Sequence, residues 1–212
     1  MRHMLRWFLV RHGETEWNRV GRAQGQADPP LNQEGRQQAE AVAARLAPVA
    51  FEAAYSSDLR RAADTALPVM RGRDTPIVHR RDLREKSFGE WEGMTYQELR
   101  LRYPAMLAEL FDERPAFAPP GGESDLELFA RAADAAARIA GRHAGTDGNI
   151  LVVSHGGTLR AMMVSMLGLP VESMWRLRLS NTGLSIITVF EGGGVTIDLL
   201  NDTGHLGPGF DA

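Results

Sequence analysis

Cysteine is absent from this chain of 212 residues. Its absence excludes disulfides, thiolate metal ligands and a cysteine nucleophile. Long apolar runs are also missing: none approaches the ~20 residues of a membrane-spanning helix. The apolar stretch in the opening segment MRHMLRWFLV is too short for a signal peptide. We therefore expect a cytoplasmic protein with no membrane partner.

A large excess of one charge is lacking too, since the formal net charge is −3 at pH 7. This balance gives no indication of a nucleic-acid partner, which a strongly basic chain would favour. With ~100–200 residues per domain as the usual range, the length fits a single domain over residues 1–212. The apolar content of 43% is ample for one core. The sequence leaves a homodimer open.

Short apolar segments alternate with helical patterns along the chain. Strands are predicted at 6–10, 51–57 and 76–80, in the all-apolar run of NILVVSHGG (149–157), and as a hairpin over 184–200. Helices are predicted at 33–47, 59–70 (capped by Ser57 or Asp58), 95–112, 124–143 (with Ser124 near its cap) and 158–168. The alternation predicts an α/β three-layer sandwich with a mostly parallel central sheet and helices on both faces.

Polar residues of unusual chemistry follow three of the predicted strands. Arg11-His12-Gly13 follows the first strand, and Ser154-His155-Gly156-Gly157 ends the run at 149–157. Arg60 and Arg61 follow the strand at 51–57. Ligands of open α/β sheets bind beyond the carboxyl ends of the strands. The fold would therefore gather two histidines and at least one arginine at one rim.

Such a rim is suited to phosphoryl chemistry. Arginine binds phosphate with two parallel hydrogen bonds, and glycines let backbone N–H groups approach an anion closely. A neutral imidazole is a nucleophile when its far nitrogen is hydrogen-bonded, and attack on phosphorus gives a phosphohistidine. Positioning and charge stabilisation can support this transfer without a metal, so no cofactor is expected. Glu85 is a candidate acid, since a carboxyl shielded from water can hold a proton near neutral pH.

Four segments together resemble the histidine phosphatase superfamily, the phosphoglycerate-mutase-like enzymes. LVRHGETEWN resembles the family signature, SSDLRRAADTA its second arginine motif, LREKSFGEWEG its acid-bearing segment and VVSHGG its second histidine motif. They occur in the expected order, and the resemblance extends from Leu9 to about Leu206. It implies the α/β fold above, with a small cap insertion over the site at about 88–122.

The resemblance also implies roles for individual residues. It makes His12 the phosphorylated nucleophile, His155 a second catalytic histidine that holds phosphoryl oxygens, and Glu85 the proton donor that later activates water. It implies phosphate binding by Arg11, Asn18, Arg61 and the backbone N–H of Gly156. The family spacing selects Arg61 over Arg60, which is expected on a helix surface.

Other residues in or near the motifs are less specifically assigned by the resemblance. Glu90 and Glu92 lie close to Glu85 in the sequence and are the alternatives to it as the acid. Trp91 is expected to pack within the cap. His205 receives no chemical role.

The leading hypothesis is a metal-independent phosphomonoesterase acting on a small phosphorylated metabolite. The alternative is a 2,3-bisphosphoglycerate-dependent phosphoglycerate mutase. The acid segment, Glu85-Lys86-Ser87-Phe88-Gly89, differs from the Glu-Arg-His-Tyr-Gly of such mutases. In addition, Arg100, Arg102 and Arg114 are too scattered to form a carboxylate site in the cap.

Two further classes are weighed. A metal hydrolase would use His12, His155 and Glu85 as ligands, but adjacent arginines would repel the cation. A non-catalytic phospholigand-binding module is disfavoured because every presumed catalytic position is intact.

Overall fold

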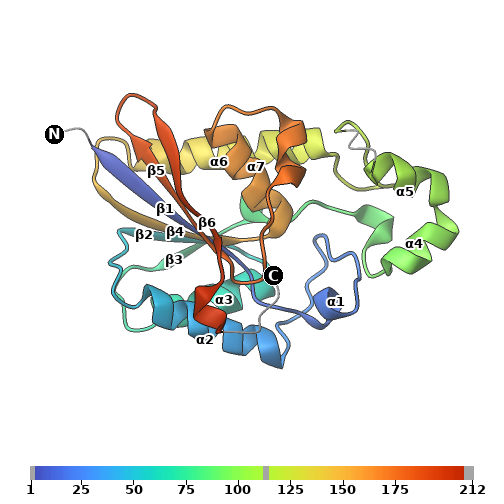
Figure 1. Ribbon diagram of the computed structural model, residues 1–212, viewed down its shortest axis with the longest axis horizontal. Coiled ribbons are helices and arrows are strands. Elements are labelled where there is room, and N and C mark those ends of the chain that lie inside the picture. Colours follow the sequence, from blue (N-terminus) through green and yellow to red (C-terminus); the bar gives the residue numbers. More distant parts are fainter. Residues whose placement is uncertain (1–2, 112–114, 208–212) are drawn as a thin grey trace.

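A six-stranded sheet forms the centre of the molecule (Figure 1). The computed structural model of the protein describes residues 3–111 and 115–207. The strand order is β3-β2-β4-β1-β5-β6. The strands are β1 (Met4–Arg11), β2 (Ala53–Ser57), β3 (Ile77–Arg80), β4 (Gly148–Ser154), β5 (Leu184–Phe190) and β6 (Val195–Asp202). The first four are mutually parallel, whereas the hairpin β5–β6 pairs antiparallel with β1. The prediction of a mostly parallel sheet with a terminal hairpin is confirmed.

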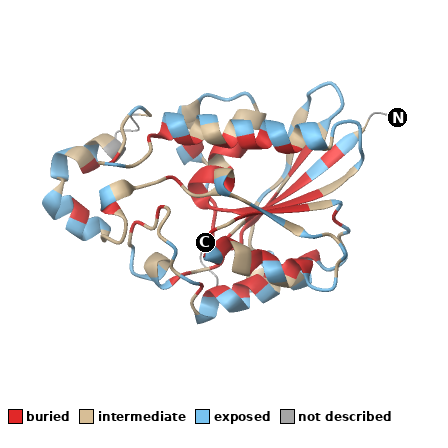
Figure 2. Ribbon diagram, turned by 180° about the vertical axis from the view of Figure 1, so that it is seen from behind, coloured by how far each residue is buried: buried red, intermediate tan, exposed pale blue. Residues whose placement is uncertain are grey.

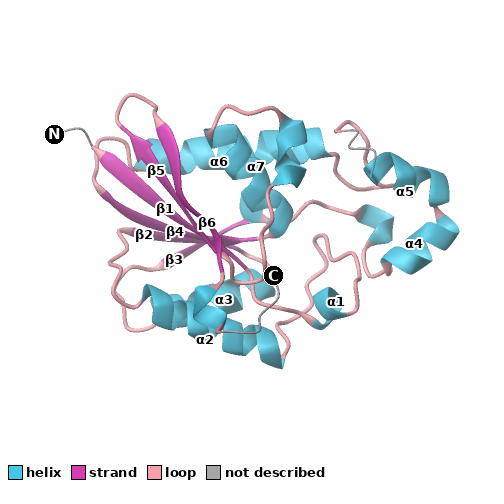
Figure 3. Ribbon diagram, in the orientation of Figure 1, coloured by secondary structure: helices cyan, strands magenta, loops and turns pink. Residues whose placement is uncertain are grey.

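Helices cover both faces of this sheet, as predicted (Figure 3). Helices α6 (Asp125–Arg142) and α7 (Gly156–Met166) lie on one face, and α2 (Gln33–Leu46) and α3 (Arg60–Met70) on the other. Alternation along β1 divides the core between the faces. Trp7 and Leu9 pack with α6 and α7, while Phe8 and Val10 pack with α2 and α3. Figure 2 shows the buried residues concentrated along the strands and the inward faces of these helices.

Three helix predictions need correction. The helix predicted at 95–112 is two helices, α4 (Tyr96–Arg102) and α5 (Pro104–Phe111), because Pro104 disfavours helical backbone at Tyr103. Helix α7 begins at Gly156, two residues before the predicted start at 158. Leu59, and neither Ser57 nor Asp58, is the N-cap residue of α3. The carboxylate of Asp28, distant in the sequence, accepts the N–H of Arg60 there (2.8 Å).

A small second core lies beyond the end of the sheet, under α4 and α5 (Figure 1). Ala23, Trp91, Leu99 and Leu107 form it, and Trp91 is fully buried. The 3-10 helix η2 (Gly89–Trp91) leads into this part of the chain. These elements lie within the segment 88–122 that the sequence predicts as a cap, and they stand beside the carboxyl ends of the parallel strands.

Short elements complete the described chain. They are α1 (Glu16–Arg19), which follows the first motif, and the 3-10 helices η1 (Arg81–Leu83), η3 (Val171–Arg176) and η4 (Gly204–Leu206). Within residues 3–111 and 115–207, no helix combines the length and apolar character needed to cross a membrane.

Candidate active site

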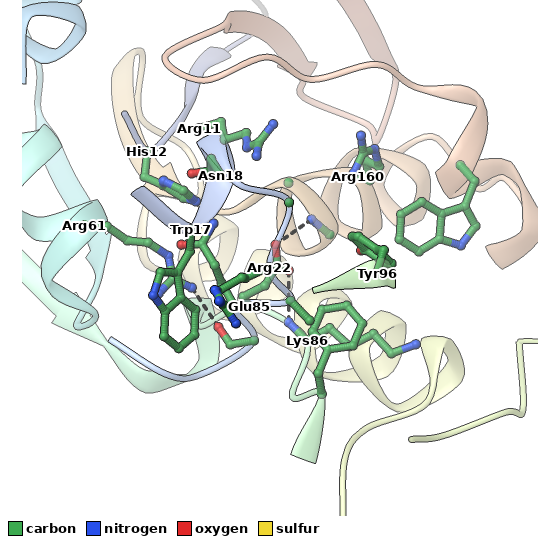
Figure 4. A pocket seen from close by; sticks show the side chains of 18 residues that line it. Arg11, His12, Trp17, Asn18, Arg22, Arg61, Glu85, Lys86, Tyr96 and Arg160 are labelled. Atoms are coloured by element: carbon green, nitrogen blue, oxygen red, sulfur yellow. Dashed lines mark hydrogen bonds between the residues drawn. The ribbon is translucent and has the colours of Figure 1, made fainter. Parts of the chain in front are cut away.

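The predicted site residues meet at the carboxyl ends of β1 and β4, as the rim argument requires. A cavity of about 290 Å³ opens there (Figure 4). It is lined by Arg11, His12, Asn18, Arg61, Glu85 and Gly156, among others. His155 lies against this group, because the centroid of its ring is 5.1 Å from that of His12. All of the predicted site residues are therefore close together.

His12 follows β1 and is almost completely buried. Its Nδ1 lies 2.7 Å from the carbonyl oxygen of Gly13. Because that oxygen only accepts, Nδ1 carries the proton and Nε2 has the free lone pair. Burial, reinforced by Arg61 and Arg11, holds the pKa of His12 well below its ordinary value. The ring is therefore neutral and has the tautomer that a nucleophile at Nε2 needs.

His155 is the N-cap residue of α7 and has the opposite tautomer. Its Nδ1 accepts a hydrogen bond from Nε of Arg61 (3.2 Å), so the proton is on Nε2. Burial, Arg61 and His12 hold the pKa of His155 well below its ordinary value. The buried Nε2–H has no partner among the described residues. A buried donor left unpaired costs about 1–3 kcal/mol, and an anion beside His12 would satisfy it.

Two buried arginines supply the positive charge. Arg11 donates from Nη1 to the carbonyl oxygen of Leu179 (2.6 Å), whereas its buried Nε–H meets no acceptor in the described part of the chain. Arg61 donates to the carbonyl oxygens of Gly25 (2.7 Å) and Ala27 (2.6 Å). Burial lowers the pKa of each arginine to about 10, so both remain cations at neutral pH. Arg61 thus orients His155 and also holds a loop at the edge of the cavity.

Asn18 and Gly156 contribute donors from two helix starts. The side-chain oxygen of Asn18 accepts from the backbone N–H (3.1 Å) and hydroxyl (3.1 Å) of Thr15, which closes a capping box on α1. This leaves the amide NH₂ of Asn18 as its donor for a ligand in the cavity. Gly156 is the first residue of α7, where backbone N–H groups point away from the helix.

The carboxylate of Glu85 is held at the start of α7. It accepts backbone N–H groups from Gly157 (3.1 Å), Thr158 (3.2 Å) and Lys86 (2.9 Å). These bonds fix its orientation where it lines the cavity. They also leave no room for a larger residue at position 157 unless the carboxylate shifts, since a Cβ there would lie 2.5 Å from Oε1 of Glu85.

Glu90 and Glu92, the alternatives to Glu85 as the acid, occupy other positions. Glu90 is exposed. Glu92 accepts the backbone N–H groups of Gln26 (2.9 Å) and Ala27 (2.8 Å) from the same loop whose carbonyls bind Arg61. It also accepts from the N–H of Phe88 (3.1 Å). Glu92 therefore ties the acid-bearing segment to the loop, a structural role that leaves Glu85 as the acid candidate.

Two other predicted positions can be placed. Arg60 is exposed, as expected for a helix-surface charge. His205 lies 3.3 Å through Nε2 from the hydroxyl of Thr182, away from the cavity lining.

The sequence reasoning missed several residues that line the cavity. They are Trp17, Arg22, Gln24, Lys86, Tyr96, Arg160 and Trp175, together with nearby backbone. For Arg160 a signal exists: it lies four residues after Gly156 in α7, so it shares the face of the helix that begins at the site. Trp175 and Tyr96 come from η3 and the start of α4, whose positions depend on tertiary packing.

The metal-hydrolase alternative would need a cluster of ligands. Across the described ranges, no group of three or more His, Cys, Asp or Glu residues is arranged to hold a metal ion. The charged groups around His12 are arginines, which favour an anion.

Comparison with known proteins agrees with this geometry. The sequence model of the histidine phosphatase superfamily (branch 1) matches residues 7–203. The chain belongs to this family. The resemblance expected from the four motifs is therefore confirmed, and the match extends over nearly the whole chain.

Individual members of the superfamily are similar over almost their full length. Phosphoserine phosphatase 1 of Hydrogenobacter thermophilus is 33% identical, with 96% of this chain and 95% of that protein covered. The solved structure of YhfR from Bacillus stearothermophilus is 35% identical and has a TM-score of 0.88, covering 96% of this chain and all of the other. A mycobacterial glucosyl-3-phosphoglycerate phosphatase, solved as a complex with VO3, is 32% identical with a TM-score of 0.85 and coverages of 93% and 99%.

Proposed function

We propose that this protein hydrolyses phosphate monoesters of small metabolites, without a metal, through a phosphohistidine on His12. One observation carries the proposal. A neutral imidazole with a free Nε2 lone pair lies beside two buried donors, Nε–H of Arg11 and Nε2–H of His155, that have no partner among the described residues. A phosphoryl group next to His12 would supply acceptor oxygens for both.

The first step transfers the phosphoryl group to the enzyme. Nε2 of His12 attacks phosphorus, and the bond between phosphorus and the ester oxygen breaks. The protonated carboxyl of Glu85 gives its proton to the leaving oxygen, so that an alcohol departs. Arg11 and Arg61, with the NH₂ of Asn18 and the N–H of Gly156, stabilise the charge on the phosphoryl oxygens during transfer.

The second step releases phosphate. The carboxylate of Glu85 takes a proton from a water molecule, whose oxygen attacks the phosphorus. The bond between phosphorus and Nε2 breaks, and its electron pair returns to His12. Inorganic phosphate leaves, and Glu85 is protonated again for the next cycle.

The family and its members favour hydrolysis over the mutase alternative. The chain is a phosphoric monoester hydrolase of a superfamily whose similar members include phosphatases for phosphoserine and for glucosyl-3-phosphoglycerate. The acid segment, with Lys86-Ser87-Phe88 after Glu85, differs from that of the mutases. The organic part of the substrate is small, in keeping with the cavity volume of about 290 Å³.

The test is an assay in excess chelator. Release of phosphate from small phosphomonoesters is compared with interconversion of 3- and 2-phosphoglycerate, with and without 2,3-bisphosphoglycerate. We expect phosphate release that is independent of bisphosphate. Interconversion that outruns release and needs bisphosphate would instead establish a mutase.

A pair of histidine variants tests the nucleophile. His12→Ala should abolish turnover and remove the acid-labile phosphoryl label that appears on the wild-type chain after rapid quenching. His79→Ala is the matched control, because His79 is exposed on β3 and does not line the cavity. Unchanged turnover in His12→Ala would refute the assignment of the nucleophile.

A further inference from the structure

The cavity has a second side, away from His12 and Arg61, where Tyr96, Arg160 and Lys86 stand (Figure 4). Glu85 lies between the two sides. Since Glu85 is proposed to protonate the leaving oxygen, this second side faces the organic part of the substrate. Its charged groups therefore decide which alcohols fit.

The charge of Lys86 is already neutralised. Lys86 is buried, and its Nζ lies 2.6 Å from Oδ1 of Asp125. The other oxygen of that carboxylate, Oδ2, accepts the indole N–H of Trp175 (2.7 Å). Lys86 and Asp125 thus form a buried ion pair that also holds Trp175 through its indole N–H. Because the two charges neutralise each other, the pair offers no net charge to a ligand.

The charge of Arg160 is not neutralised in this way. Its Nε donates to the carbonyl oxygen of Leu177 (2.7 Å), and its guanidinium carbon lies 5.3 Å from the centre of the Trp175 ring. Within residues 3–111 and 115–207, no carboxylate forms an ion pair with it. The carboxylate of Glu85 attracts the guanidinium electrostatically, but it accepts backbone N–H groups and forms no ion pair with Arg160. The guanidinium is anchored at Nε and packed on an indole, so Nη1 and Nη2 remain as a rigid, half-buried cationic fork.

We propose that Arg160 binds a carboxylate in the organic part of the substrate, so that phosphate monoesters of small hydroxy acids are preferred over those of neutral alcohols. A planar guanidinium fork matches a carboxylate with two parallel hydrogen bonds. The inference rests on the proposed function, because it requires that the phosphoryl group lies at His12. The sequence analysis expected no carboxylate site from Arg100, Arg102 and Arg114, the last of which lies outside the described residues, and the proposal places such a site on α7 instead.

A matched pair of substrates tests the proposal. 3-Phosphoglycerate and glycerol 3-phosphate share one carbon skeleton, and the carboxylate of the first is a hydroxymethyl group in the second. The measured quantity is the ratio of their kcat/KM values. Arg160→Met keeps an unbranched stem against Trp175 and removes the fork, so we expect the ratio to fall about 10- to 100-fold. Arg160→Lys should restore part of it, since an ammonium keeps the charge without the bidentate geometry.

Arg176→Met is the control variant, because Arg176 is an exposed arginine of η3 outside the cavity lining and its substitution should leave the ratio unchanged. Two results would overturn the proposal. One is a wild-type ratio that does not favour the acid. The other is an equal loss on both substrates in Arg160→Met, which would place the guanidinium on the phosphoryl group itself.

A binding measurement separates this proposal from the proposed function. Calorimetry on the His12→Ala variant compares the Kd of 3-phosphoglycerate with that of glycerol 3-phosphate, with and without Arg160→Met. If no phosphoryl label forms on His12 in the wild type, the proposed function fails. A preference for the acid that disappears with Arg160→Met still supports the carboxylate site, whereas equal Kd values contradict it.

Discussion

At the scale of single residues, the site consists of two imidazoles with opposite tautomers. The carbonyl of Gly13 fixes the proton of His12 on Nδ1, while Nε–H of Arg61 fixes that of His155 on Nε2. One ring therefore presents a lone pair and the other a donor. Burial, reinforced by Arg61 and Arg11, holds both imidazoles neutral, and the same arginines supply the positive charge for a phosphoryl group.

Glu85 allows a residue-scale prediction about the leaving group. In Glu85→Gln, the loss of a proton donor should lower kcat/KM for glycerol 3-phosphate about 10²–10⁴-fold. The loss for p-nitrophenyl phosphate should be far smaller, because nitrophenolate leaves without being protonated. Steady-state kinetics on both substrates measures the difference. Glu90→Gln serves as the control at an exposed neighbouring acid, and equal losses on the two substrates would move the acid to another residue.

Sequence reasoning located the residues that the sheet itself positions. His12 and His155 directly follow buried parallel strands, and Arg61 lies in the first turn of the helix after β2, so their convergence follows from strand order alone. Trp175 was missed because its placement depends on its contact with Asp125, which joins segments distant in the sequence. Arg160 was missed although its position four residues after Gly156 places it on the helix face that begins at the site.

At the scale of elements, the start of α7 positions the proposed catalytic groups, because its backbone N–H groups hold the carboxylate of Glu85. The sequence predicted this helix from 158, and glycine is a poor helix former. The structure begins the helix at Gly156, and the carboxylate of Glu85 occupies the space beside Gly157. Pro104 has a comparable effect on the helix predicted at 95–112, because a proline disfavours helical backbone at the preceding Tyr103 and divides it into α4 and α5.

This packing predicts that Gly157→Ala impairs the acid specifically. The added Cβ would lie 2.5 Å from Oε1 of Glu85, so the carboxylate must move and lose its backbone donors. We expect a stability cost of about 1–3 kcal/mol and a kinetic signature like that of Glu85→Gln, with glycerol 3-phosphate affected more than p-nitrophenyl phosphate.

Gly141→Ala is the matched control for this substitution. Gly141 lies within α6, and a Cβ there meets no atom within 4 Å. Alanine should stabilise that helix by up to about 1 kcal/mol and leave the kinetics unchanged. Denaturant unfolding and kinetics on the two substrates measure both effects. Identical behaviour of the two alanine variants would show that Gly157 does not restrain Glu85.

At the scale of the whole molecule, three distant parts of the chain must fold together before the site exists. The loop at Gly25 and Ala27 is held through its carbonyls by Arg61 and through N–H groups by Glu92, and Arg61 in turn holds His155. The segment around Glu92, the loop and the sheet rim are thus one hydrogen-bonded unit. The fold that builds this unit also keeps two imidazoles uncharged in a cationic environment, which links the stability of the protein to pH.

The two buried imidazoles make the protein less stable in acid. The pKa values of His12 and His155 are held well below 6.5 in the native protein, chiefly by burial. Below pH 6.5 these imidazoles bind protons in the unfolded chain but not in the native one. The free energy of unfolding must therefore decrease as the pH falls from 6.5, by at most about 1.4 kcal/mol per pH unit for each imidazole. His205, whose pKa is also lowered by burial, adds in the same direction.

Urea unfolding at pH 7.5, 6.5 and 5.5 tests this prediction. The carboxyl groups of Asp58 and Asp82, with pKa values lowered by arginine partners, lose their contribution only below pH 3.8, outside this window. The midpoint should be nearly constant from pH 7.5 to 6.5 and then decrease. His12→Asn keeps a donor near the Nδ1 position of His12, and His155→Asn keeps an acceptor near that of His155. Since asparagine does not titrate, each variant should show a smaller decrease of the midpoint between pH 6.5 and 5.5. His79→Ala, at an exposed histidine, should not. A midpoint independent of pH down to 5.5 would mean that the native protein binds protons at these rings, and the neutral nucleophile would have to be abandoned.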